Sequence, residues 1–393
     1  MKVMLMTLPD EGETVDYTTD KFLLNRKVKY MPLGILSVAS GVSSMHEVNI
    51  FDAASKGIGI KDTLDEIHKY APDVLCISAV THRAFALAQI LKNANVPCKV
   101  VGGPHITYYS KETLTLGAHA VFIHDGDKNF GSWLDGGLPE GIFEDYIKDI
   151  NELPSPRREL LSINDYMVAE EDAQKTIFKK AGARVPIYSS KGCPFQCIFC
   201  DVQEKKFRYL HPKRVVDEME KIVSLGARSV HILDDCFNII EDRVIEICKE
   251  IKRRNLKFEW SARGRAKISV DTARALSEAG CKRLHVGVES LDDNVLKWMG
   301  KSINTETIAQ FFKNCTEYNI ETVAYFIIGT PVETAEYRGN LPGIIKKLKV
   351  TFPYFNLLYP AANSGYYKSL IKNGIFKKDY WKEFAENPSV DFM

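Results

Sequence analysis

Short apolar runs alternate with amphipathic segments through the first 130 residues of the chain. The runs KVMLMTL (residues 2–8) and PDVLCISAV (residues 72–80) are typical of buried strands, and the apolar residues of HRAFALAQILKNA (residues 82–94) recur at helical spacing. Repeated strand–helix–strand units predict a parallel sheet with helices on both faces. We therefore expect residues 1–130 to form a doubly wound, Rossmann-like α/β domain.

The ligand-binding edge of such a sheet lies at the carboxyl ends of its strands. The pattern predicts loops at that edge near Pro9, near Asp52, and over residues 78–83, 102–105 and 125–128. Residues 131–184 are less regular and include the proline-punctuated run NELPSPRREL. We expect this stretch to be a linker laid over the surface, not an independent domain.

The strand–helix alternation resumes at Val185. Six apolar runs follow, each separated from the next by a helical pattern: VPIYSS, RSVHILDD, FEWSARG, KRLHVGVES, TVAYFIIGTP and PYFNLLYP. Six units are too few for a closed eight-stranded barrel, so we expect a partial (βα)6 TIM-type barrel over residues 185–365. Residues 366–393 would be a short carboxyl-terminal extension.

Composition and charge exclude several classes of partner. The 393 residues carry a formal net charge of +1 with no basic patch, which argues against a nucleic-acid partner. No apolar run has the length of a membrane span, and the first residues lack the cleavage site of a signal peptide. The nine cysteines are odd in number and mostly scattered, so we expect a protein of the reducing cytoplasm.

Three of those cysteines share one short stretch, GCPFQCIFC. Cys193, Cys197 and Cys200 follow the first strand of the second half, at the end where barrels place their chemistry. A structural zinc site normally takes four ligands from two separated pairs, and no second pair is present. Three thiolates can hold a [4Fe–4S] cluster with one iron left open. The alternative is a chance grouping of three cysteines in a core loop.

The stretch GCPFQCIFC resembles the signature of the radical S-adenosylmethionine (SAM) enzymes, including an aromatic residue, Phe199, before the third cysteine. The resemblance implies that the open iron chelates the amino and carboxylate groups of SAM. It further implies that one electron cleaves SAM to methionine and a 5′-deoxyadenosyl radical, which abstracts hydrogen from an unactivated C–H bond. The partial barrel expected above is also the fold of that family.

Further strand ends of this half resemble the SAM site of that family. HILDDCF offers Asp235 where many members carry Gly-Gly-Glu, and SARGR offers Arg263 for the SAM carboxylate, although Arg263 could also be a surface arginine. A carboxylate that ends a buried apolar strand needs a partner, which favours a ligand role for the residues of GVES. The resemblance implies this set of SAM-binding residues: Phe199, Asp235, Arg263, Glu289, Ser290 and Gly329.

The amino-terminal half resembles the cobalamin (B12)-binding domain found in one branch of these enzymes. The resemblance rests on MPLGILSVAS, PDVLCIS with the Thr81 that follows, and KVVGGPH. It implies a corrin at the carboxyl edge of the sheet, where small residues let it approach the backbone. The cobalamin candidates are Ser78, Thr81, His82, Gly102 and Gly103. His82 could bind cobalt from below, or it could be a solvated or capping histidine; the cobalt-binding motif Asp-x-His-x-x-Gly is missing.

The resemblance implies a [4Fe–4S] cluster, SAM and cobalamin as cofactors, a small-molecule substrate, and an external electron donor such as flavodoxin or ferredoxin. Three functions remain open at this stage: B12-dependent methylation of an unactivated carbon, a radical cyclisation or rearrangement with the same cofactors, and a non-catalytic cluster- and corrin-binding sensor. The sequence does not identify the substrate. Aromatic residues late in the chain could line a substrate pocket, but packing is the preferred interpretation: Tyr354, Tyr359, Tyr366, Tyr367 and Trp381.

Overall fold

The computed structural model describes residues 1–11, 30–168, 182–202 and 204–389 of the chain. Its contacts divide the chain into two compact units. Unit 1 comprises Met1–Asp165 and Asn373–Met393, and unit 2 comprises Tyr166–Lys372. The chain therefore passes from unit 1 into unit 2 and returns to unit 1 near its end. Within the described residues, no helix has both the length and the apolar character that crossing a bilayer requires.

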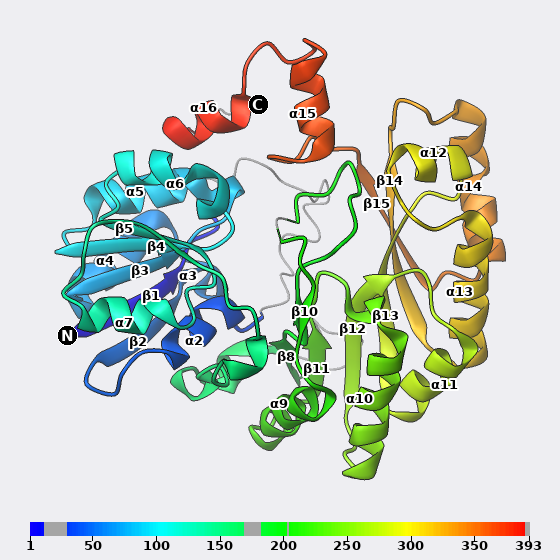
Figure 1. Cartoon of the computed structure of the whole chain (residues 1–393), viewed down its shortest axis with the longest axis horizontal. Helices are drawn as coiled ribbons and strands as arrows, with labels where there is room; N and C mark the ends of the chain where they lie inside the picture. The colour runs from blue at the N-terminus through cyan, green and yellow to red at the C-terminus, as the bar shows by residue number, and fades with distance from the viewer. Residues whose placement is uncertain (12–29, 169–181, 203, 390–393) are drawn as a thin grey trace. The chain divides into compact units, whose positions relative to one another are not determined.

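Unit 1 is built on a six-stranded, wholly parallel sheet in the order β2-β1-β3-β4-β5-β6, which confirms the predicted doubly wound α/β fold (Figure 1). The pairing aligns the carboxyl ends of neighbouring strands, since Thr7 pairs with Asp52 and Ser78, and Ser78 pairs with Gly102. The strands are β1 (Lys2–Thr7), β2 (Glu47–Asp52), β3 (Val74–Ser78), β4 (Cys98–Gly102), β5 (Ala120–His124) and β6 (Gly141–Asp145).

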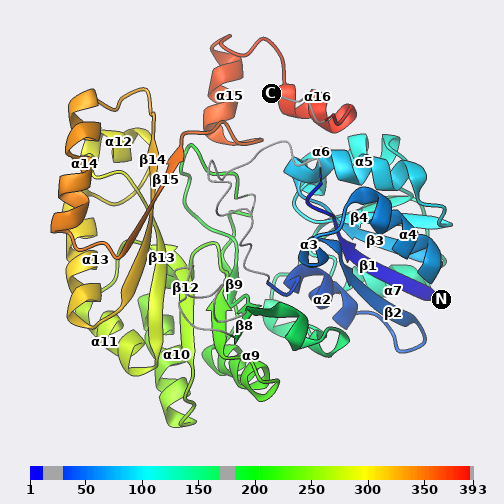
Figure 2. The same cartoon turned by 180° about the vertical axis from the view of Figure 1, so that it is seen from behind.

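Helices cover both faces of this sheet, with α5 and α6 on one side and α2 and α7 on the other (Figures 1 and 2). Alternate strand residues point to opposite faces, so Met4, Met6 and Leu75 pack in a core shared with the helices. The helices of unit 1 are α2 (Leu33–Ser40), α3 (Ala53–Lys56), α4 (Ile60–Tyr70), α5 (Ala84–Asn93), α6 (Ile106–Thr115), α7 (Asn129–Asp135) and α16 (Tyr380–Glu386).

The last helix of unit 1, α16, lies against α6 although the two are far apart in sequence. Its carboxylate cap, Asp379, accepts a hydrogen bond from the Lys382 N–H at 3.1 Å. Trp381 and Phe384 are buried at 2% and 1% exposure. Trp381 is therefore a packing residue of unit 1.

Unit 2 contains six parallel strands with an antiparallel strand, β7, at one edge. The sheet order β15-β14-β13-β12-β11-β8-β7 follows the chain without closing, which confirms the expected partial (βα)6 barrel. The strands are β7 (Met167–Val168), β8 (Gly182–Ile187), β11 (Ser229–Ile232), β12 (Glu259–Arg265), β13 (Cys281–Glu289), β14 (Glu321–Ile328) and β15 (Phe352–Leu357).

The outer face of this sheet is apolar and carries the helices (Figure 2). Buried side chains such as Val230, Trp260 and Val286 alternate with polar ones, as the two-residue period of a strand requires. The helices are α9 (Pro212–Ser224), α10 (Glu241–Arg253), α11 (Val270–Glu278), α12 (Asp293–Trp298), α13 (Thr305–Glu317), α14 (Ala335–Lys347) and α15 (Gly365–Lys372).

The other face of the sheet is polar. The His231 ring on β11 hydrogen-bonds to the Ser261 hydroxyl on β12, and it meets the His285 ring on β13 at a centroid distance of 4.9 Å. His285 Nδ1 lies 3.2 Å from the Tyr325 hydroxyl on β14. Burial lowers the pKa of His285 to about 3, helped by the charges of Arg283 and Arg263, so the imidazole is neutral near pH 7.

Candidate functional site

The three clustered cysteines lie on the loop that follows β8 and the short strand β9 (Ser190–Lys191). All three are free thiols and partly exposed, whereas the chain's other six cysteines are buried. A partly exposed thiol can reach a ligand, and a buried one acts as a small apolar side chain. The structure therefore separates the sequence-predicted trio from the remaining cysteines: Cys76, Cys98, Cys236, Cys248, Cys281 and Cys315.

Backbone hydrogen bonds hold this loop in place. The Cys193 N–H donates to the Glu204 carbonyl at 2.9 Å, and the Ile198 N–H donates to the Met299 carbonyl at 2.9 Å. The Ile198 carbonyl in turn accepts from the Tyr366 N–H at 2.6 Å. The turn after α12 and the start of α15 thus fix the middle of the loop before any cofactor arrives.

Three thiols on one loop form a donor set that suits a multi-iron cluster. In a [4Fe–4S] cluster each thiolate binds a different iron, so its ligands stand apart. Burial raises the pKa of Cys193, and raises that of Cys200 to about 11, so these groups are thiols until a metal displaces the proton. The donor set therefore fits the cluster that the motif predicts.

The two aspartates that follow β11 have different surroundings. Asp234 is fully buried and accepts hydrogen bonds from the Ser189 N–H and hydroxyl, both at 2.6 Å, and from the Ser190 hydroxyl at 2.5 Å. This carboxylate ties the end of β8 to β11. Asp235 instead accepts from the Gly192 N–H at 3.0 Å, one residue before Cys193. The structure thus places the predicted Asp235 directly beside the cysteine loop.

Arg263, near the end of β12, is exposed and contributes positive charge to the same region. Burial raises the pKa of the Asp235 carboxyl, while the Gly192 hydrogen bond and the Arg263 charge act in the opposite direction. An anionic Asp235 and a cationic Arg263 could meet the ammonium and carboxylate ends of an amino acid.

The structure gives Glu289 and Ser290, at the end of β13, protein partners that the sequence did not reveal. Glu289 has a φ of +67° and is paired in a buried position with Lys301 at 3.1 Å. Lys301 also donates to the Gly287 carbonyl at 2.7 Å. The Ser290 hydroxyl donates to the Tyr337 hydroxyl at 3.0 Å. Both predicted residues are therefore fixed in orientation by long polar side chains from later in the chain.

Lys301 also connects Glu289 to the cysteine loop. Its neighbour Gly300 has a φ of +69°, and a side chain there would meet the Gln196 carbonyl at 3.1 Å. The loop thus contacts the turn after α12, and Lys301 of that turn reaches the end of β13. The structure brings together the cysteines, Asp235 and Glu289 at the carboxyl ends of strands of one sheet.

Two further predicted residues complete this edge. Gly329 follows β14 with a φ of +83°, and nothing lies within 4 Å of where its Cβ would be. Its N–H donates to the Glu333 carboxylate at 3.1 Å. Phe199 is partly buried in the cysteine loop. Open space beside the Gly329 backbone would let a flat ligand approach closely.

In unit 1 the predicted residues gather at the carboxyl ends of β3 and β4. Ser78 and Gly102 are register partners, while Thr81 and His82 form the 3-10 turn η1 (Thr81–Arg83). Gly103 has a φ of +95°, and a Cβ there would lie 2.7 Å from the Ala79 carbonyl oxygen. The chain itself therefore needs glycine at this position, apart from any ligand.

A buried histidine that sequence reasoning passed over lies under this edge. His105 is fully buried, and its Nδ1 lies 3.3 Å from the Thr81 hydroxyl. Its Nε2 has no hydrogen-bond partner among the described residues. Burial lowers the pKa of His105 to about 4, so the ring is neutral near pH 7. The sequence did contain this histidine, as the last residue of the KVVGGPH stretch that suggested a cobalamin-binding domain.

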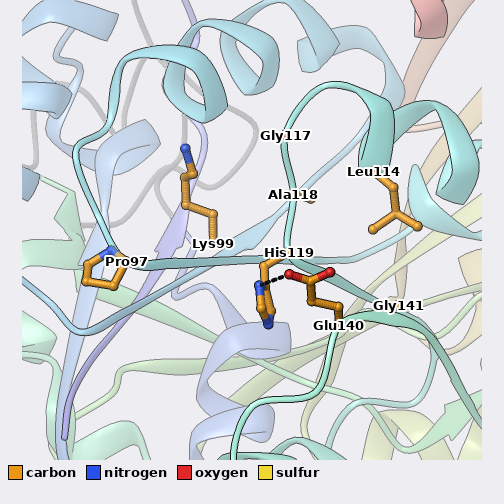
Figure 3. Close-up of a pocket in the computed structure, with 8 residues that line it drawn as sticks. All are labelled: Pro97, Lys99, Leu114, Gly117, Ala118, His119, Glu140 and Gly141. Atoms are coloured by element: carbon orange, nitrogen blue, oxygen red, sulfur yellow. Dashed lines mark ion pairs between the residues drawn. The ribbon is translucent and has the colours of Figure 1, made fainter.

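A surface pocket of about 490 Å³ lies at the opposite edge of the unit 1 sheet, by the amino ends of β4, β5 and β6 (Figure 3). His119 and Glu140 point toward one another there, with 3.5 Å between Nδ1 and Oε1. None of the predicted ligand-binding residues lines this pocket.

Comparison with known proteins matches each half of the chain to a family. Residues 187–341 match the radical SAM superfamily, and residues 21–131 match the B12 binding domain. An uncharacterized methyltransferase of Pyrococcus horikoshii is 28% identical over 90% of this chain and 81% of its own length. Bacteriochlorophyllide d C-12(1)-methyltransferase of Chlorobaculum tepidum is 24% identical over 86% of this chain and 74% of its own.

Another relative is named as a cyclase and not as a methyltransferase. Anaerobic magnesium-protoporphyrin IX monomethyl ester cyclase of Cereibacter sphaeroides is 24% identical over 74% of this chain, which spans about half (52%) of that protein. Among solved structures, the radical SAM methyltransferase TsrM of Kitasatospora setae, with cobalamin and a [4Fe–4S] cluster bound, has a TM-score of 0.69 at 16% identity. It covers 95% of this chain and 75% of its own.

The two matched families lie in the order that the sequence predicted, with the B12-binding match in unit 1 and the radical SAM match in unit 2. A radical SAM domain implies a [4Fe–4S] cluster and SAM, and a B12 binding domain implies cobalamin. The chain therefore combines a radical SAM domain with a B12 binding domain.

Proposed function

We propose that this protein is a B12-dependent radical SAM methyltransferase that methylates an unactivated carbon of a small molecule. The observation that carries the proposal is the loop of three partly exposed thiols at the carboxyl end of a six-stranded parallel barrel, in one chain with a B12 binding domain. When bound, the cluster would supply an electron for reductive cleavage of SAM, and cobalamin would supply the methyl group.

The cluster would be held by Cys193, Cys197 and Cys200. The chain's own polar groups would then orient SAM at the same edge. Asp235 would accept from the SAM ammonium group, and Arg263 would bind its carboxylate. Glu289 and Ser290 would bind the ribose or amino acid part of SAM. Phe199 and the open backbone at Gly329 would line the space for its adenosine.

Cobalamin would lie against the carboxyl ends of β3 and β4, over Ser78, Thr81, His82, Gly102 and Gly103. A neutral His105 beneath Thr81 would support this surface without adding a charge. The assignment is supported by the match of residues 21–131 to the B12 binding domain and by the usual ligand position in doubly wound sheets.

The substrate would be a small molecule, and an external donor such as flavodoxin or ferredoxin would supply electrons. Free, oxidisable thiols favour a reducing compartment such as the cytoplasm. A second candidate function is a radical cyclisation with the same cofactors, which the similarity to the magnesium-protoporphyrin IX monomethyl ester cyclase favours. Methylation is favoured by the similarity to the bacteriochlorophyllide methyltransferase, which extends over most of this chain.

The test is anaerobic reconstitution of the full chain with iron, sulfide and hydroxocobalamin, followed by metal analysis and incubation with SAM and a reductant. We expect about four irons and about one cobalt per chain, with 5′-deoxyadenosine and S-adenosylhomocysteine as products. Deoxyadenosine without S-adenosylhomocysteine, once substrate is supplied, would favour the cyclase. Iron without cobalt would remove B12 from the mechanism, and bound cofactors with no SAM turnover would leave only a sensor.

A further inference from the structure

One buried cation beside the cysteine loop has no acidic partner among the residues that the structure describes. Arg265 ends β12 with 9% of its surface exposed, and its guanidinium lies 3.6 Å from the centroid of the Phe195 ring. Phe195 lies between Cys193 and Cys197 in the loop. Within the described parts of the chain, Arg265 makes no ion pair, and its Nη2 is buried without a hydrogen-bond partner.

Several other arginines of unit 2 have a carboxylate partner, even where one guanidinium nitrogen is left without a hydrogen bond. Arg254 contacts the carboxylates of Asp217, Glu220 and Glu250, and Arg283 contacts that of Glu321 although its Nε is unpartnered. A buried guanidinium without a partner is costly, because the charge has lost its water and gained no anion in exchange. Arg265 has no such carboxylate within the described parts of the chain, so its charge is free to meet a bound anion.

The backbone holds Arg265 at this place. Its N–H donates to the Asn238 Oδ1 at 2.8 Å, and its carbonyl accepts from the Asn238 Nδ2 at 3.0 Å. A side chain at the preceding Gly264 would come within 2.2 Å of that Asn238 oxygen. The position of Arg265 is thus built into the fold before any cofactor binds.

We propose that Arg265, held against Phe195, is the counter-charge of the [4Fe–4S] cluster and raises its reduction potential. A cluster held by three thiolates carries net negative charge, and each added electron makes it more negative, so a nearby buried cation favours the reduced form. Because the cation is buried, salt should screen its effect only weakly. This inference rests on the cluster assignment of the proposed function.

The test is a redox titration of the reconstituted full chain without SAM, followed by electron paramagnetic resonance. Arg265→Gln should lower the ratio of reduced to oxidised cluster at a fixed potential by about tenfold, a shift of 59 mV for one electron. Arg265→Lys should retain most of the wild-type potential, because it keeps the charge. Lys267→Gln, which removes an exposed charge two residues later, is the matched control and should leave the potential unchanged.

The outcomes separate this inference from the proposed function. Arg265→Gln with full iron content and a wild-type potential would overturn the role of Arg265 alone. An equal shift in Arg265→Lys would also overturn it, because the effect would then not follow charge. Weaker SAM binding with an unchanged SAM-free potential would mean that Arg265 serves SAM and not the cluster. Absence of a cluster from the wild-type chain would instead overturn the proposed function.

Discussion

The two units offer their proposed cofactors opposite kinds of surface. In unit 2 the site is charged and polar, with three thiols, Asp235, and the buried Glu289–Lys301 pair. In unit 1 the residues at the ends of β3 and β4 are mainly glycines, hydroxyls and a neutral histidine, His105, with the Asp10–Arg83 ion pair beside them. A cluster and a zwitterionic amino acid need charged ligands, whereas a large, flat corrin needs shape and backbone access. The difference explains why residue chemistry is easier to read from the sequence in unit 2.

Loss of one cluster thiol should have the largest effect and should separate the two units most clearly, because it concerns the site in unit 2 alone. Replacing Cys197 with alanine leaves two thiols, so we expect the reconstituted chain to lose its iron and all SAM cleavage while it still binds cobalamin. Iron and cobalt analysis of the same sample measures both. The matched control is Cys248→Ala, which removes one of the buried thiols and should keep its iron. Full iron in the Cys197 variant would sink the cluster assignment.

Truncating Trp381, the largest buried side chain of α16, should destabilise unit 1 and leave unit 2 unchanged. Trp381 is 2% exposed, and truncating a buried tryptophan to alanine typically costs about 3–5 kcal/mol of unfolding free energy. Hydrogen exchange of the Trp381→Ala chain should rise in α6 and β5 and stay unchanged in β11–β14. Lys382→Ala on the exposed side of the same helix is the control. Equal loosening of both units would argue against the assignment of α16 to unit 1.

Acid should weaken both units, each through one buried neutral histidine. The pKa of His105 falls to about 4 and that of His285 to about 3, below the ordinary value, so the unfolded chain binds more protons once the pH drops below about 6.5. Stability is therefore full above that pH and falls as the pH decreases toward the folded values. Each histidine should cost about 2 kcal/mol between about pH 8 and about pH 5.

Single substitutions can separate the contributions of the two histidines to the loss of stability in acid. Urea unfolding at several pH values should show a flatter pH dependence for His105→Asn in unit 1 and for His285→Asn in unit 2. Hydrogen exchange reports which unit opens first in each case. Wild-type pH dependence in both variants would mean that carboxylates, and not these imidazoles, control the acid response.

The sequence predicted the features that depend on local pattern. Strand periodicity predicted both sheets, and the closely spaced cysteines predicted the loop that the structure leaves partly exposed. It did not predict pairings between separate segments, such as Lys301 with Glu289, 12 residues apart, or Ser189 with Asp234, 45 residues apart. It also missed the return of α16 to unit 1 and the stacking of Arg265 on Phe195. Those contacts depend on how distant parts of the chain pack, which no local period records.

Substitutions at two of the positive-φ glycines, Gly329 and Gly103, should have the smallest effects and test the two strand edges separately. Alanine at a left-handed position costs about 1–2 kcal/mol. At Gly329 that strain is the whole cost, because no atom lies within 4 Å of the new Cβ. At Gly103 the Cβ would also approach the Ala79 carbonyl oxygen to 2.7 Å and the Ala79 nitrogen to 2.9 Å, so β3 and β4 must part. Urea midpoints should therefore fall further for Gly103→Ala than for Gly329→Ala.

Ligand affinity and stability should respond differently in these two variants. The open space at Gly329 is where SAM would approach, so Gly329→Ala should weaken SAM binding several-fold while the chain remains nearly as stable as wild type. Gly103→Ala should lose stability first, and its cobalamin affinity should fall only as far as the strand ends separate. Equal midpoints for the two variants would mean that the Gly103 backbone relaxes without strain. Unchanged SAM affinity in Gly329→Ala would move the adenosine away from the end of β14.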